Sequence, residues 1–226
     1  MDKENNWYFD NRQEKAKWLA GRFSEVFLNS RKVLDVGCWQ KDLRKHLPEN
    51  THYLGIDIAG NPDQKINLDK IDKLPFSDNE FDMVVCADVL EHLENLHLVF
   101  DELLRISNKH VIITLPTSAN IDSFRRILLG KIYSNTSEAK KKFGKYLKYY
   151  GLPLERPDDR HRWFFSYKEA VDFVNYRAEK YQYRIKILDN DLFYIKNKLN
   201  FKYKLFYLFK KELLISSLIV LLEKNK

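Results

Sequence analysis

The chain has 226 residues, 44% of them hydrophobic, and a formal net charge of +7. That length and apolar content suit one α/β domain over residues 1–226, with a substantial core and one active site. Its two cysteines, Cys38 and Cys86, lie in apolar runs and form no CxxC pair, which excludes a disulfide framework and indicates reduced core residues in a cytoplasmic protein.

The N-terminal part, residues 1–30, predicts a helix ahead of the sheet. Residues 1–10 are polar and acidic, unlike a secretory signal. Apolar side chains then recur at helical spacing over residues 11–27. We therefore expect an amphipathic helix before the first strand.

Short apolar runs followed by turn residues predict five strands that alternate with helices. The expected strands are 33–36, 53–58, a short one around Ile66 and Leu68, 81–87 and 111–115. The expected helices between them are 43–47 and 89–106. This alternation is typical of a Rossmann-like, doubly wound α/β fold, with a mainly parallel sheet, helices on both faces and right-handed crossovers.

After the fifth strand the alternation stops, and residues 117–160 predict an insertion that forms an acceptor-side lid. Within it, residues 131–148 are basic, as is the tail segment 196–211. Such runs favour an anionic partner, such as a nucleotide-linked sugar, nucleic acid or an acidic membrane surface. Solvated helix faces explain them more simply.

The last part of the chain, residues 181–226, is expected to close the sheet. A helix over 165–176 precedes it and begins with the capping box of Ser166 and Glu169. The expected closing elements are a strand at 183–195, an amphipathic helix at 201–213 and a strand at 214–222. The apolar run 213–222 has about half the length needed to cross a bilayer, so we expect no membrane span. The amphipathic helix either covers the sheet, which we favour, or makes peripheral contact with a membrane.

Three runs of the sequence resemble the motifs of a known enzyme family. They are VLDVGC at 33–38, GID at 55–57 and the long run LPFSDNEFDMVVCADVLEHL at 74–93, which is the most specific. Together they resemble class I S-adenosylmethionine-dependent methyltransferases, in the branch that methylates small molecules, quinones and sugars. The resemblance covers residues 30–116 well and the remainder weakly. It implies a methyltransferase with S-adenosylmethionine as cofactor.

The resemblance also implies which residues hold the cofactor beyond the carboxyl ends of the strands. Gly37 lets the backbone approach the ligand without a Cβ, and the helix that follows offers N–H groups to the ligand's carboxylate. Asp57, at the end of the second strand, accepts hydrogen bonds from the ribose hydroxyls, unless it only caps a turn. Asp69 meets the adenine amino group, unless it is a surface aspartate. The other implied cofactor contacts are Asp35, Cys38, Trp39, Ile58, Ala87 and Asp88.

The sequence departs from the family in the loop after the first strand. Where the family has Gly-x-Gly-x-Gly, this chain continues from Gly37 with Trp39 and Lys41 at the second and third glycine positions. If those positions need a positive φ, the loop must be rearranged and cofactor affinity falls, which Lys41 would partly offset by pairing with the cofactor carboxylate. The departure also argues against a nicotinamide enzyme, because the dinucleotide fingerprint needs all three glycines.

A second group of residues follows the fourth strand. Asp88, Glu91 and His92 stand at i, i+3 and i+4 of the expected helix and therefore on one face. Some family members that methylate hydroxyls hold a divalent metal with a similar pattern and a distant histidine, which His161 would supply here. The simpler interpretation, which we favour, has no metal. In that case His92 or His161 is the candidate general base.

These observations favour an S-adenosylmethionine-dependent methyltransferase that acts on oxygen of a small-molecule or glycan-linked acceptor. Two alternatives stay open. The replacements in the glycine loop allow a module of the same fold that binds cofactor without catalysis, and the basic insertion allows a nucleic-acid methyltransferase. Salt-sensitive binding would mark the nucleic-acid enzyme. The fold does not select the acceptor.

Overall fold

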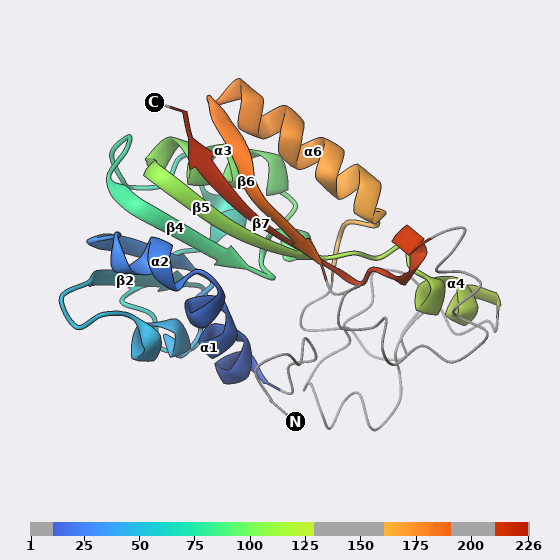
Figure 1. Ribbon diagram of the computed structural model, residues 1–226, viewed down its shortest axis with the longest axis horizontal. Coiled ribbons are helices and arrows are strands. Elements are labelled where there is room, and N and C mark those ends of the chain that lie inside the picture. Colours follow the sequence, from blue (N-terminus) through green and yellow to red (C-terminus); the bar gives the residue numbers. More distant parts are fainter. Residues whose placement is uncertain (1–10, 129–160, 191–210, 226) are drawn as a thin grey trace.

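The structure, a computed structural model, describes residues 11–128, 161–190 and 211–225. In this part of the chain one seven-stranded sheet has the strand order β3-β2-β1-β4-β5-β7-β6 (Figure 1). Its strands are β1 (Lys32–Val36), β2 (His52–Asp57), β3 (Gln64–Lys65), β4 (Phe81–Ala87), β5 (Ser107–Pro116), β6 (Tyr183–Asn190) and β7 (Ser217–Lys224). Strands β1 to β5 pair in parallel, whereas β7 runs antiparallel to both neighbours, β5 and β6.

Helices cover both faces of this sheet. The α-helices are α1 (Arg12–Arg22), α2 (Ser24–Leu28), α3 (Leu96–Ile106), α4 (Ile121–Leu128) and α6 (Tyr167–Lys180). The 3-10 helices are η2 (Asp42–His46), η3 (Leu68–Lys70), η4 (Leu90–His92) and η5 (Lys211–Leu214). The doubly wound, mainly parallel α/β fold expected from the sequence is therefore confirmed.

The two faces arise because successive side chains of a strand point in opposite directions. Leu34 and Val36 of β1 lie in a buried cluster with α3 and α6, and Val33 of the same strand lies in a second cluster with α1 and α2. Figure 1 shows α3 and α6 together, away from α1 and α2. Because both faces are covered, the central strands carry buried apolar side chains on both sides of the sheet.

Strand order reverses between β1 and β4. From β1, the strands β2 and β3 follow on one side, and β4 and β5 lie on the other. Val36 at the end of β1 pairs with Cys86, next to the end of β4. In open α/β sheets ligands bind outside the carboxyl ends of the strands at such a switch point. The residues that follow β1, β2 and β4 are therefore the ones that can form a site.

Several expected elements near this edge have different bounds. The helix over 11–27 is broken at Phe23 into α1 and α2. The third strand lies at Gln64–Lys65 and not around Ile66 and Leu68, because the side chain of Asn67 accepts the N–H of Asp69 at 3.0 Å and starts η3. Contrary to our expectation, Asp69 therefore does not directly follow a strand.

The helix expected over 89–106 also differs. It is divided into the single turn η4 and the helix α3, which begins at Leu96. The division lies where the carboxylate of Asp69 accepts the N–H groups of Glu94 and Asn95, at 2.9 and 3.3 Å. These two bonds hold the backbone that precedes α3 in a turn, so that Asp88, Glu91 and His92 do not share one regular helical face.

The C-terminal part follows the prediction more closely. The capping box of Ser166 and Glu169 is present and begins α6, which runs on to Lys180. The first closing strand is described up to Asn190 and the second is β7. Of the expected insertion 117–160, residues 129–160 lie outside the described residues, as does 201–210 of the expected amphipathic helix. Among the helices described, none is long and apolar enough to cross a membrane.

Candidate functional site

The loop after β1 has a left-handed backbone at all three glycine positions of the family pattern. The φ angles are +81° at Gly37, +48° at Trp39 and +58° at Lys41. The loop is therefore not rearranged to suit the two larger side chains. Holding a residue with a Cβ in this conformation costs roughly 1–2 kcal/mol, so the surrounding contacts must hold Trp39 and Lys41 in place.

Backbone contacts with the loop after β2 supply that support. The N–H of Trp39 donates to Oδ2 of Asp57 at 2.8 Å, and its carbonyl accepts the N–H of Asn61 at 2.8 Å. A Cβ at Gly60 would lie 2.4 Å from the same carbonyl oxygen, so only glycine fits there. The indole of Trp39 also lies under the guanidinium of Arg12 from α1, 5.0 Å from the ring centroid.

Asp57 thus holds the loop together as well as its own turn. Its Oδ1 accepts the N–H of Ala59 at 3.0 Å, which is the turn-capping role that the sequence allowed. Each carboxylate oxygen can still accept another hydrogen bond. The neighbouring side chain, Ile58, is 62% exposed although it is apolar. Ribose contact by Asp57 and cofactor contact by Ile58 and Trp39 stay predictions.

Lys41 has a partner within the protein, and its pairing with the cofactor carboxylate stays a prediction. Its ammonium pairs with Oδ1 of Asp63 at 2.7 Å, while Oδ2 of Asp63 accepts the N–H of Gly55 at 2.8 Å. The segment that follows the loop is also weaker as an anion site than expected. It is the five-residue 3-10 helix η2, with the acidic Asp42 in its first turn.

Asp35 lies in β1 and is buried. Burial raises its pKa to about 7, and the nearby carboxylates of Asp57 and Asp42 act in the same direction, against the hydrogen bond from Tyr53. The hydroxyl of Tyr53 donates to Oδ2 of Asp35 at 2.7 Å. A cationic group bound beside Asp35 would therefore favour its ionised form. Cys38, also an expected contact, is a buried thiol whose pKa is raised to about 12, chiefly by burial.

Asp88 follows Ala87 at the end of β4 and has a φ of +53°. Its carboxylate accepts hydrogen bonds from the ammonium of Lys15 in α1 and from the hydroxyl of Thr114 in β5, the latter at 2.6 Å. Burial alone would raise the pKa of Asp88, but Lys15 and Thr114 outweigh it, so the pKa lies below its ordinary value. Asp88 is thus engaged by Lys15 and lies outside the group of Glu91, His92 and His161 described next, although His161 also contributes to lowering the pKa of Asp88.

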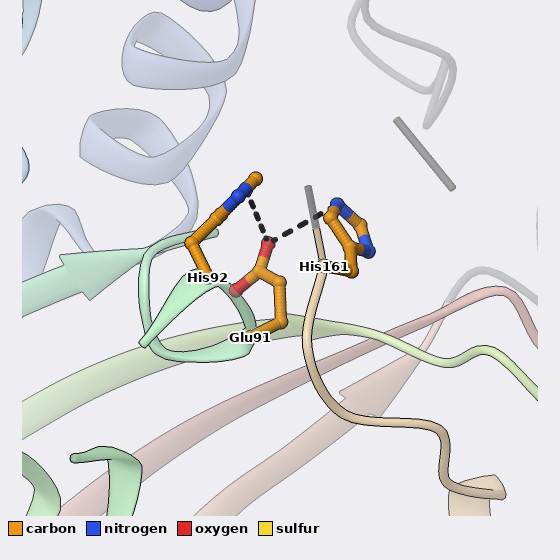
Figure 2. A group of neighbouring side chains, drawn as sticks. All are labelled: Glu91, His92 and His161. Atoms are coloured by element: carbon orange, nitrogen blue, oxygen red, sulfur yellow. Dashed lines mark ion pairs between the residues drawn. The ribbon is translucent and has the colours of Figure 1, made fainter. Parts of the chain in front are cut away.

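Glu91, His92 and His161 come together, as Figure 2 shows. The carboxylate of Glu91 lies between the two imidazoles, with Oε1 3.6 Å from Nε2 of His92 and 4.0 Å from Nε2 of His161. The ring centroids of the histidines are 4.6 Å apart. One potential ligand atom from each residue lies within 4.8 Å of the others. The side chain of Glu91 is only 1% exposed, so its charge acts in a largely dry setting.

Arg162 connects the segment that carries His161 with the turn that carries Glu91 and His92. Arg162 and His92 are 70 positions apart in the chain. The N–H of Arg162 donates to the carbonyl of Glu91 at 2.8 Å, and its Nε donates to the carbonyl of His92 at 2.7 Å. The indole N–H of Trp163 adds a bond to the carbonyl of Leu93 at 2.6 Å. The segment that carries His161 is therefore attached to the turn after β4 by its backbone as well as by side chains.

Neither Lys15 nor Thr114 was singled out in the sequence, and the bonds of Arg162 to the turn after β4 were not predicted. Their partners are far along the chain, and neither periodicity nor a motif connects them. Asp69, which we expected at the adenine, accepts N–H groups ahead of α3 and has Nη2 of Arg162 at 3.8 Å. Its contact with adenine stays a prediction.

The comparisons with known proteins agree with this geometry. The family model that matches the chain describes a methyltransferase domain and covers residues 8–176. No curated protein matches the chain. Among solved structures, magnesium protoporphyrin IX methyltransferase from Synechocystis PCC 6803 with bound SAH is 13% identical, with a TM-score of 0.55 over 94% of this chain and 83% of that one.

Two further solved structures show the same likeness. A SAM-dependent methyltransferase from Archaeoglobus fulgidus is 16% identical, with a TM-score of 0.53 over 96% of each chain. An S-adenosylmethionine-dependent methyltransferase from Mesorhizobium loti is 14% identical, with a TM-score of 0.51 over 92% of this chain and 98% of that one. At these identities the likeness shows the fold alone, whereas the family model covers more than half of the chain. The chain therefore belongs to the methyltransferase domain family, in agreement with the S-adenosylmethionine-dependent class that its motifs resemble.

Proposed function

We propose that the protein transfers a methyl group from S-adenosylmethionine to a hydroxyl oxygen of a small-molecule or glycan-linked acceptor. The observation that carries the choice of oxygen is the group of Glu91, His92 and His161 just beyond the end of β4. A hydroxyl must lose its proton on methylation, and two imidazoles with a buried carboxylate are suited to take it.

The residues at the switch point fit S-adenosylmethionine. Asp57 retains acceptor capacity at the end of β2, and Ile58 offers an exposed apolar surface beside it. The carboxylates along this edge suit a ligand that carries a sulfonium and an ammonium group. When bound, S-adenosylmethionine supplies an activated methyl group for direct displacement, so alignment contributes much of the acceleration.

The histidine group supplies the proton acceptor. One of the imidazoles of His92 and His161 takes the hydroxyl proton, and the carboxylate of Glu91 stabilises the imidazolium that forms. Arg162 keeps both histidines at this carboxylate through its bonds to the backbone of Glu91 and His92.

Methyl-transfer assays with a panel of hydroxylated acceptors test this proposal. His92→Ala and His161→Ala should each lower kcat, and general-base catalysis of this kind contributes about 10²–10⁴-fold. Binding of S-adenosylhomocysteine should change little. His52→Ala is the matched control, because His52 is exposed at the opposite, amino end of β2. Unchanged kcat in both variants would refute the assignment of the base. Cofactor binding without transfer to any acceptor would instead support the non-catalytic alternative.

The same three side chains support a second candidate, a divalent metal that activates the acceptor hydroxyl. Two imidazole nitrogens and one carboxylate oxygen within 4.8 Å are a suitable donor set for a transition metal, and such a metal would lower the pKa of a hydroxyl held beside it. Asp88, engaged by Lys15, would not be among the ligands.

Titration with Mn²⁺ or Mg²⁺ separates the two candidates. The metal candidate requires calorimetric binding that Glu91→Gln abolishes, and activity that a chelator removes and the ion restores. The general-base candidate requires activity that a chelator leaves unchanged and that falls as an imidazole becomes protonated. A nucleic-acid acceptor would be recognised by binding that weakens steeply with salt.

A further inference from the structure

We propose that the ammonium of Lys15 binds the carboxylate of S-adenosylmethionine and so positions its methionine end. This proposal depends on the function proposed above, because it assumes that S-adenosylmethionine occupies the switch point. Lys15 lies in none of the family motifs, and its place is evident only from the fold.

The position of Lys15 follows from the start of α1. The side chain of Asn11 accepts the N–H of Glu14 at 3.0 Å and caps the helix. One turn later, the Lys15 side chain, 15% exposed, reaches the carboxyl ends of β4 and β5. Its ammonium donates to Asp88 and, at 3.0 Å, to the hydroxyl of Thr114. An ammonium has three donors, so one remains for a ligand.

The helix itself lies across the switch point. Arg12 and Lys15 are three positions apart and so lie on one side of α1. Arg12 contacts Trp39 in the loop after β1, while Lys15 contacts Asp88 after β4. Figure 1 shows α1 near the tips of these strands. A ligand between the two strand ends would therefore meet the Lys15 side of this helix.

Charge supplies the next step of the argument. The methionine end of the cofactor carries an ammonium and a carboxylate, and Asp35 and Asp88 suit only the ammonium. The carboxylate needs a cation or free N–H groups. Lys41, like Lys15, has a carboxylate partner, but that partner is Asp63, which also accepts the N–H of Gly55 in β2, so Lys41 is held on the β2 side of the switch point. The 3-10 helix η2 is too short and too acidic at its start to replace a long helix. Lys15 is the described cation that lies at the end of β4.

The existing hydrogen bonds prepare Lys15 for this role. Asp88 and Thr114 hold the ammonium before any ligand arrives, so binding would not have to order a flexible lysine side chain. The ion pair of Lys15 with Asp88 also keeps the local charge balanced when no ligand is bound. Lys15 is thus a positioning residue, and its effect should depend on the ligand's carboxylate.

Two ligands distinguish this role from a structural one. S-adenosylhomocysteine has the amino-acid carboxylate, whereas 5′-methylthioadenosine lacks the whole amino-acid end. Lys15→Gln should weaken calorimetric binding of S-adenosylhomocysteine by about 10- to 100-fold, the value of one charge-assisted hydrogen bond. Binding of 5′-methylthioadenosine should stay within about twofold of wild type, and Lys15→Arg should retain most of the affinity. Lys17→Gln, exposed on the same helix, is the matched control and should change neither affinity.

If Lys15→Gln weakened the binding of both ligands equally, the proposal would be overturned, because Lys15 would then act only by supporting the structure of the site. Unchanged affinity for S-adenosylhomocysteine would overturn it as well. If Lys15→Gln does not fold, the double variant Lys15→Gln/Asp88→Asn is compared with Asp88→Asn alone, so that the loss of the Asp88 carboxylate is common to both and the difference in affinity reports on Lys15. Wild-type protein that binds neither ligand would refute the proposed function itself, which is a different result from a failure of Lys15 alone.

Discussion

Replacing Gly37 with alanine is expected to destabilise the protein by about 2–4 kcal/mol. The new Cβ would lie 2.2 Å from Cγ2 of Val89, which follows β4, so the packing of the two loops must give way. The backbone φ of +81° adds the cost of a left-handed alanine. Urea unfolding of the variant and the wild type measures the difference. Gly21→Ala is the control, because a Cβ there meets nothing within 4 Å and a helical alanine should stabilise the chain.

A double-mutant cycle separates the two causes. Val89→Ala removes both methyl groups and leaves only Cβ, which lies 3.4 Å from the new Cβ at position 37. The double variant should therefore recover the steric part and retain roughly 1–2 kcal/mol for the backbone. The coupling between the two sites should exceed about 1 kcal/mol. Additive effects would refute the close approach of the loops after β1 and β4.

Further predictions concern Asp35, Trp39 and Arg162. The folded pKa of Asp35, about 7, lies above its ordinary 3.8, so its ionisation opposes folding. Wild-type stability should fall relative to Asp35→Asn as pH rises from 4 to 7, by at most about 4 kcal/mol, and unfolding at several pH values would show it. At position 39 φ is +48°, a conformation that glycine adopts more readily than alanine. Trp39→Gly should therefore be more stable than Trp39→Ala by roughly 1 kcal/mol, whereas in a helix alanine is the more stable of the two, and urea unfolding midpoints measure the difference. Arg162→Ala should lower the free energy of unfolding by about 1 kcal/mol, because the bond to the His92 carbonyl is lost, and it should lower kcat more than cofactor affinity. A kcat unchanged from wild type would contradict the role of Arg162 in holding the histidines.

The fold was predictable because its signals are local. The apolar run of β4 is buried on both faces, and its bounds agree with the prediction. The capping box of Ser166 and Glu169 likewise lies within four consecutive residues. The prediction of one helix over 89–106 was wrong for its first part. Asp69, which is distant in the sequence, holds the backbone of Glu94 and Asn95 in a turn. Periodicity carries no information about such a contact.

The site was predictable only in part, for the same reason. Glu91 and His92 were found because they lie within the motif at 74–93, and His161 because the resemblance implies a distant histidine that it can supply. The contacts of Lys15 and Arg162 could not be predicted, since Lys15 pairs with a residue 73 positions away and Arg162 bonds to a carbonyl 70 positions away. The substitution of glycine by Trp39 and Lys41 suggested a changed loop, yet the left-handed backbone is kept by contacts that only the fold brings together.

The central claim is that S-adenosylmethionine binds at the switch point between β1 and β4. Calorimetric titration of the wild type and of Asp57→Ala with S-adenosylmethionine and S-adenosylhomocysteine tests it most directly. We predict a dissociation constant on the order of micromolar for the wild type and a large loss of affinity in the variant, because Asp57 holds the loop at Trp39 and, as proposed, accepts hydrogen bonds from the ribose. Absence of binding to the wild type, or binding that Asp57→Ala leaves unchanged, would contradict the claim.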